Sequence, residues 1–193
     1  MSEIVLATHG LTRAYGQSRA LDNVSITVEK GEIYGLVGRN GAGKTTLMRL
    51  VTGQSAPTAG SVELFGQTGR ELARARSRTG AMIETPSFAP FLTARENLEY
   101  YRIQRGIPGK GAVDEVLEAV DLRDTGKKKF KTFSLGMKQR LGLALALMNH
   151  PEFLLLDEPI NGLDPEGIVE FRNILLELNR QRETTILISS HIL

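Results

Sequence analysis

The sequence predicts an α/β fold whose core alternates strands and helices and is interrupted by a helical insert. Both ends of the chain contain short apolar runs typical of buried strands, each followed by a loop or a helical pattern. The region between them, from about residue 86 to residue 150, has mainly helical periodicity. The length of 193 residues fits one domain of this class.

Composition indicates an ordinary globular domain. Hydrophobic residues make up 41% and charged residues 24% of the chain, which argues against disorder. The formal net charge of +2 is too small to indicate a nucleic-acid partner, and we expect none. Cysteine is absent, which excludes disulfides and thiolate chemistry. The apolar runs are too short to cross a bilayer, so any membrane spans must come from another subunit.

The first elements follow from local patterns. Residues 24–28 alternate apolar and polar side chains, as a half-buried antiparallel strand does. Residues 33–37 are nearly all apolar, which predicts a buried strand. A helix is expected over residues 44–52, because its apolar residues share one face and a glycine follows it. A turn at residues 56–60 and a strand at residues 61–65 come next.

The insert begins with a capping box formed by Thr93 and Glu96, which opens a helix. Two later helices are predicted from apolar stripes at i, i+3, i+4 and i+7: Val113, Val116, Leu117 and Val120, then Leu141, Ala144, Leu145 and Met148. Buried strands return at residues 153–156 and 185–189, with a helix between them that Asp164 caps.

A phosphate-binding loop lies between the second predicted strand and the helix that follows it. Residues 38–45 match the pattern G-x-x-x-x-G-K-T. Glycines let the backbone turn its N–H groups toward phosphate oxygens, and the helix start adds a positive dipole end. Lys44 would bind the β- and γ-phosphates, and Thr45 would offer a hydroxyl to Mg²⁺. The residues expected to bind nucleotide here are Gly38, Asn40, Gly41, Ala42, Gly43, Lys44, Thr45 and Thr46.

Two adjacent acids end the strand at residues 153–156. Acids rarely end a buried strand without a role, because an unpaired buried charge is costly. Asp157 is the expected Mg²⁺ ligand, and Glu158 is the expected general base for water. An acidic loop after a core strand is the alternative when this pair is taken alone.

Taken together, these residues resemble the nucleotide-binding domain of ABC transporters over essentially the whole chain. The resemblance implies a P-loop NTPase core, ATP and Mg²⁺ as ligands, and ATP hydrolysis. It assigns Tyr15 to stacking on adenine and His191 to the γ-phosphate. It also implies a homodimer in the ATP state, an integral membrane permease as partner, and a place on the cytoplasmic face of the membrane.

Residues 133–140, with the sequence FSLGMKQR, are similar to the signature motif of that family. Ser134, Gly136 and the helix that follows would face the γ-phosphate held by a second copy. Leu135 and Met137 depart from the usual pattern. Without the resemblance, Ser134 is an ordinary helix cap.

Glu84 stands where the family usually has glutamine, and we expect it near Mg²⁺ and the attacking water. The alternative is a solvent-facing side chain. Glu84 and the signature together resemble the bacterial subgroup that exports or resists peptide antibiotics such as bacitracin and lantibiotics.

The domain expected from the resemblance has its core at residues 1–85 and 151–193 and a helical subdomain at about 86–150. We expect its C-terminal end to be truncated, because the family normally continues beyond this point.

Three consecutive lysines occupy residues 127–129. Such a run is typical of a solvated loop, but facing a membrane it would favour anionic headgroups. Four aromatic residues either line a groove for a permease helix or belong to the core: Phe88, Phe91, Tyr100 and Tyr101.

Two other functions use the same phosphate loop. A soluble ATPase of this superfamily, acting in translation or DNA repair, usually has two such domains or a long coiled-coil insert. Neither is visible in this chain. A GTPase should contain N-K-x-D, which is absent, and a small-molecule kinase would need neither the signature at Ser134 nor His191.

Overall fold

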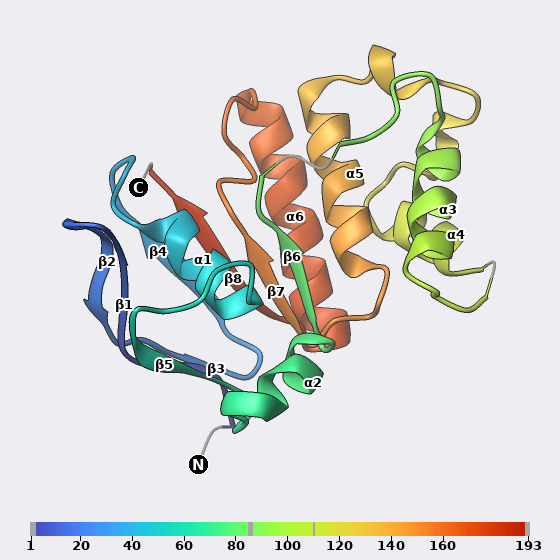
Figure 1. Ribbon diagram of the computed structural model, residues 1–193. Coiled ribbons are helices and arrows are strands. Elements are labelled where there is room, and N and C mark those ends of the chain that lie inside the picture. The colour runs from blue at the N-terminus through green and yellow to red at the C-terminus, as the bar shows by residue number, and fades with distance from the viewer. Residues whose placement is uncertain (1–2, 85–86, 110, 192–193) are drawn as a thin grey trace.

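The computed structural model describes residues 3–84, 87–109 and 111–191, and these form two sheets with flanking helices (Figure 1). In the antiparallel sheet, β1 (Ile4–Tyr15) pairs with β2 (Ser18–Val24), β3 (Thr27–Glu29) and β5 (Ala59–Leu64). The parallel sheet has the order β4 (Ile33–Val37), β8 (Thr185–Ser190), β7 (Phe153–Leu156) and β6 (Thr79–Met82). The α/β fold with an antiparallel N-terminal part is confirmed.

Helices cover both faces of the parallel sheet (Figure 1). Helix α1 (Lys44–Thr52) lies on the face toward the antiparallel sheet. Helices α5 (Leu135–Leu147) and α6 (Pro165–Arg182) cover the other face, with α3 (Ala94–Gln104) and α4 (Gly111–Ala119) outside them. Four short elements complete the described chain: η1 (Gly69–Glu71), α2 (Leu72–Arg76), η2 (Arg123–Thr125) and η3 (Phe130–Thr132).

Strand β7 separates two hydrophobic clusters, because its side chains alternate between the faces of the sheet. Leu154 and Leu156 join the cluster that contains α3 to α6. Phe153 and Leu155 join the cluster that contains α1 and the antiparallel sheet. All four side chains are fully buried, so burial on both faces explains why the strand is apolar throughout.

The helix-end signals in the sequence correspond to real caps. Thr93 accepts a hydrogen bond from the Glu96 N–H, and the Glu96 carboxylate accepts one from the Thr93 N–H. Asp164 accepts a bond from the N–H of Gly167 at the start of α6. Gly53 ends α1 with φ of 79°, a conformation that favours glycine.

The prediction of a single strand over residues 24–28 is wrong. The strand is interrupted between β2 and β3, because the Thr8 side chain of β1 hydrogen-bonds to the backbone on both sides of this point. The Thr8 hydroxyl donates to the Val24 carbonyl and accepts from the Ile26 N–H, at 3.0 Å in both cases. One buried hydroxyl therefore lets the chain change its pairing partner along β1.

Strand β4 is in its predicted place, but its burial was overestimated. Ile33 is 38% exposed and Val37 is 49% exposed. The cause is its position, because β4 is an edge strand of the parallel sheet among the described residues. Its apolar sequence alone does not distinguish an edge from a central strand.

Two of the four aromatic residues of the insert belong to the core, which was one of the two predicted roles. Phe88 is buried and Tyr101 packs against the core, with their rings in an edge-to-face contact. Phe91 and Tyr100 are exposed.

Among the residues described, none of the helices combines the length and apolar character that crossing a membrane requires.

Candidate nucleotide site

The phosphate loop connects the end of β4 to the start of α1. Gly41 and Gly43 have φ of 82° and 91°, which glycine adopts without strain. A Cβ atom on Gly43 would lie 2.5 Å from the carbonyl oxygen of Ala20, so β2 approaches this turn closely. A cavity of about 490 Å³ opens over the loop and is lined by Ala20, Asn40, Gly41, Ala42, Gly43, Lys44, Thr45, Thr46, Glu158 and Asn161.

Lys44 is the buried cation of this cavity, with a side chain only 8% exposed. Its Nζ atom donates to the carbonyl oxygens of Gly38 at 2.6 Å and Arg39 at 3.2 Å. It also lies 3.1 Å from the Glu158 carboxylate. The ammonium group is thus held over the loop by the protein's own oxygens, where an anionic ligand can replace the carboxylate.

Asp157 connects three elements at the carboxyl edge of the parallel sheet. Its Oδ2 atom accepts a hydrogen bond of 2.6 Å from Thr45 on α1. Its Oδ1 atom accepts one of 2.6 Å from Ser189 on β8. The same Ser189 hydroxyl accepts a bond of 2.9 Å from the Glu158 N–H, so one buried serine fixes both acids.

Glu158 follows β7 in the left-handed region, with φ of 49°, which strains a residue other than glycine. This turn directs its carboxylate to both Lys44 and His191, and His191 Nδ1 is hydrogen-bonded to Glu158 Oε2. Burial raises the pKa of the Glu158 carboxyl, but the hydrogen bonds from His191 and Lys44 outweigh it and hold that pKa below its ordinary value. The carboxylate is therefore ionised at neutral pH.

The donor set at Thr45 and Asp157 fits Mg²⁺. Their oxygen atoms lie 2.6 Å apart at the base of the phosphate loop. Mg²⁺ prefers hard oxygen ligands and usually keeps only one or two protein ligands, with phosphate and water completing the shell. Among the described residues no group of three or more acidic, histidine or cysteine side chains forms a fully protein-bound metal site. Thr45 and Asp157 alone would leave the rest of a Mg²⁺ shell to ligand oxygens and water.

Glu84 and Tyr15 are among the predicted site residues that lie outside the cavity lining. Glu84 forms an ion pair with Arg49 on α1, and its side chain is 71% exposed. Tyr15 is 54% exposed at the end of β1, and the guanidinium carbon of Arg13 lies 4.5 Å from the centre of its ring.

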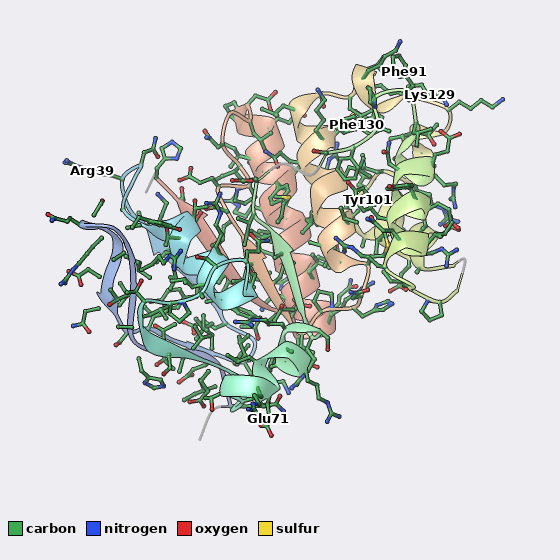
Figure 2. All side chains as sticks on the ribbon, in the orientation of Figure 1. Arg39, Glu71, Phe91, Tyr101, Lys129 and Phe130 are labelled. Atoms are coloured by element: carbon green, nitrogen blue, oxygen red, sulfur yellow. The ribbon has the colours of Figure 1, made fainter. Side chains whose placement is uncertain are left out.

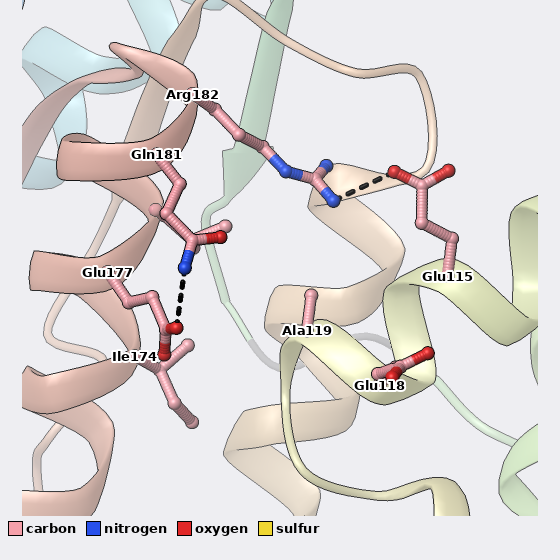
Figure 3. Close-up of a pocket in the computed structure, with 8 residues that line it drawn as sticks. Glu115, Glu118, Ala119, Ile174, Glu177, Gln181 and Arg182 are labelled. Carbon is pink, nitrogen blue, oxygen red and sulfur yellow. Dashed lines mark hydrogen bonds and ion pairs between the residues drawn. The ribbon is translucent and has the colours of Figure 1, made fainter.

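The signature residues lie elsewhere. Ser134 caps α5 by accepting a hydrogen bond of 3.2 Å from the Met137 N–H. Ser134 and Gly136 line a separate cavity of about 300 Å³ together with Gly162 and Asp164. Neither residue lines the phosphate-loop cavity of its own chain. A third cavity, of about 330 Å³, lies between α4 and α6 and contains none of the predicted site residues (Figure 3).

Comparison with known families decides the class of this site. The family described as ABC transporter matches residues 21–161, which include the phosphate loop, the signature and both acids. The chain belongs to the ABC transporter family.

Known ABC relatives are similar over nearly the whole chain. The bacitracin transport ATP-binding protein BcrA of Bacillus licheniformis is 49% identical over 193 residues, covering 98% of this chain and 62% of that protein. The lantibiotic transport ATP-binding protein SrtF of Streptococcus pyogenes is 43% identical over 190 residues, covering 98% and 81%. The chain thus spans less than two thirds of the length of BcrA.

A solved ABC structure has the same fold. It is the dimeric, post-hydrolysis state of the ATP-binding cassette MJ0796 bound to ADP and Pi, with a TM-score of 0.81 and 26% identity. The match covers 96% of this chain and 88% of that one.

Sequence reasoning missed two residues of this ABC site. Ala20 lines the cavity and contacts Gly43 through its backbone, which no side-chain pattern reveals. Ser189 was included in a strand but given no role. The sequence did contain an indication of a role for Ser189, because a serine within a buried apolar strand needs hydrogen-bond partners.

Proposed function

We propose that this chain is the ATP-binding and ATP-hydrolysing motor of an ABC transporter that exports a peptide antibiotic or confers resistance to one. The observation that carries the proposal is the convergence of Lys44, Asp157, Glu158 and His191 at one edge of the sheet, over the phosphate loop. A cation, a metal-binding acid, a base and a histidine connected to one another beside the phosphate loop are the groups that phosphoryl transfer to water requires.

Binding of ATP would begin with an exchange at Lys44. In the structure its ammonium group is paired with Glu158. The β- and γ-phosphates carry more charge than one carboxylate, so they would draw Lys44 away from that pair. The loop N–H groups and the positive end of α1 would bind the remaining phosphate oxygens. Thr45 and Asp157 would hold Mg²⁺, which supplies positive charge against the triphosphate.

The same exchange would prepare Glu158 as a general base. Its hydrogen bonds to Lys44 and His191 lower its pKa and therefore weaken it as a proton acceptor. When both partners turn to phosphate oxygens, the carboxylate loses two stabilising contacts and becomes more basic. It could then accept a proton from the attacking water while His191 contacts the γ-phosphate.

The complete site would need a second copy of the chain. Ser134 and Gly136 lie at the start of α5, in a cavity separate from the phosphate loop. A helix start attracts phosphate, so ATP on one copy can bind this end of the other. The dimeric state of the ATP-binding cassette MJ0796 supports a homodimer.

The names of the relatives support the rest of the assignment. BcrA and SrtF are transport ATP-binding proteins for bacitracin and lantibiotics, respectively. By this analogy the partner is an integral membrane permease, and the motor works at the cytoplasmic face of the membrane.

The proposed domain has its core at 1–85 and 151–193 and a helical part at about 86–150. Tyr15 would stack on adenine, and Glu84 would reach Mg²⁺ after leaving Arg49.

Replacing Lys44 tests the proposal. Lys44→Ala should abolish tight binding of Mg-ATP and its hydrolysis, measured by a fluorescent nucleotide and by phosphate release. Lys30→Ala is the matched control, because Lys30 is exposed and pairs with Glu3 near the start of the chain. Equal affinity for ATP in both variants would refute the assigned site.

A further inference from the structure

A β-bulge brings the hairpin of β1 and β2 against the phosphate loop. The pairing register between the two strands shifts by one position at Ala20 of β2, which is therefore an extra residue in that strand. Such a residue changes the local direction of the backbone. The Ala20 carbonyl oxygen is the atom that approaches Gly43. Figure 2 shows Arg39 of the phosphate loop on the same side of the molecule as this hairpin.

Tyr15 lies at the end of the same hairpin. It pairs with Ser18, which is two residues before Ala20 on β2. Two residues of a strand span about 7 Å, a separation that the ribose and first phosphates of a nucleotide can bridge. The Tyr15 side chain is exposed, so a base whose phosphates lie on the loop can reach its ring.

Arg13 covers one face of the Tyr15 ring. Its guanidinium carbon lies over that face, 4.5 Å from the ring centre. The Nη1 atom of Arg13 donates a hydrogen bond of 2.8 Å to the Ala56 carbonyl, in the turn after α1. This turn is held against β1, since the Thr58 N–H donates to the Thr12 carbonyl at 2.8 Å. The guanidinium is therefore a fixed plane beneath the ring, and the opposite face of the ring is open.

The hydroxyl group of Tyr15 is held as well. Hydrogen bonds from the side chains of Arg13 and Ser55 keep the pKa of Tyr15 below its ordinary value of 10.0. Arg13 thus contacts both the face and the polar end of the ring. A side chain that is already held in one orientation loses less freedom when a ligand binds, and this favours binding.

We propose that Arg13 is a positioning residue for nucleotide binding: it stacks on one face of Tyr15 and holds the ring so that the base of ATP stacks on the other face. Because Tyr15 stacks on adenine in the function proposed above, the role of Arg13 depends on that function. Arg13 acts through the ring and does not contact the phosphates. It therefore strengthens binding of a nucleotide but not of its phosphate chain alone.

Calorimetry with two ligands tests this role in the full chain. The ligands are Mg-ATP and inorganic triphosphate with Mg²⁺, which has the phosphates but no base. Arg13→Ala should weaken ATP binding about two- to fivefold, the range of an exposed cation–π contact, and leave triphosphate binding unchanged. Arg13→Lys should recover only part of the ATP affinity, because an ammonium group lacks the planar face of guanidinium.

Arg19→Ala is the matched control. Arg19 is exposed on β2 of the same hairpin and forms an ion pair with Asp22, so this variant makes the same change in charge nearby. It should leave both affinities unchanged. Circular dichroism spectra equal to that of the unchanged chain show that the variants fold.

A double variant shows whether Arg13 acts through the ring. Tyr15→Ala should weaken ATP binding about tenfold, and adding Arg13→Ala should cause no further loss. The role of Arg13 is overturned if Arg13→Ala binds ATP as Arg19→Ala does, if it weakens triphosphate binding equally, or if its effect persists without the ring. Unchanged ATP affinity in Tyr15→Ala would instead remove the base-stacking role of Tyr15, and the role of Arg13 with it.

Discussion

Replacing Ser189 by alanine tests whether one buried hydroxyl holds the two acids in place. The side chain is fully buried, donates to Asp157 and accepts from the Glu158 N–H. Losing a hydrogen bond to a carboxylate costs about 1.5–3 kcal/mol, and losing a neutral one costs about 1 kcal/mol. Ser189→Ala should therefore lower the free energy of unfolding by about 3 kcal/mol.

Urea unfolding followed by circular dichroism measures this change, and phosphate release measures its effect on hydrolysis. Hydrolysis should fall more than ATP affinity, because Lys44 and the loop are untouched while both acids lose a contact. Ser77→Ala is the control, since Ser77 is exposed and its hydroxyl donates to the Arg74 carbonyl, and it should change stability by less than about 0.5 kcal/mol. If Ser189→Ala matches this control in both measurements, the hydroxyl does not organise the site.

Three other substitutions probe separate parts of the site. Gly43→Ala should abolish ATP binding, because its Cβ would lie 2.5 Å from the Ala20 carbonyl at a positive φ; calorimetry with ATP measures this. Because the folded-state pKa of Glu158 is lowered, its ionisation contributes stability above the ordinary value of 4.5, and this contribution is lost as pH falls through the lower folded value. The difference in unfolding free energy between the unchanged chain and Glu158→Gln should therefore shrink below about pH 4.5. Glu84→Gln should change stability by less than about 1 kcal/mol, because its ion pair is exposed, and should raise the Mg²⁺ concentration needed for half-maximal hydrolysis.

Local signals in the sequence predicted the elements that carry the site. The helix at Lys44–Thr52 has its predicted bounds, because a glycine-rich turn precedes it and Gly53 ends it. The capping box at Thr93 and the cap at Asp164 likewise depend on neighbouring residues only. The strand at Phe153–Leu156 was clear from its length and apolar composition.

Features that depend on distant residues were not predictable in the same way. The break after β2 depends on Thr8, which is 16 residues before Val24 in the chain. The exposure of β4 depends on its place at the sheet edge. Glu84 pairs with Arg49 and does not line the cavity, although the family pattern predicted a place near the metal. Each case requires the tertiary arrangement, which periodicity does not contain.

In the proposed motor, Glu158 is the base that activates water. Glu158→Gln preserves the size of the side chain and removes its negative charge. It should bind Mg-ATP at least as tightly as the unchanged chain, because Lys44 loses a competing carboxylate. Its hydrolysis should be at least about a hundredfold slower, and it should accumulate as an ATP-bound dimer. Glu71→Gln, a change at the far end of the molecule, serves as the control (Figure 2).

The most direct measurement is phosphate release by Glu158→Gln under saturating Mg-ATP, together with its mass in solution. If Glu158 is the general base, phosphate release should be very slow and the variant should form a stable dimer. Release at the rate of the unchanged chain, with no dimer, would contradict it.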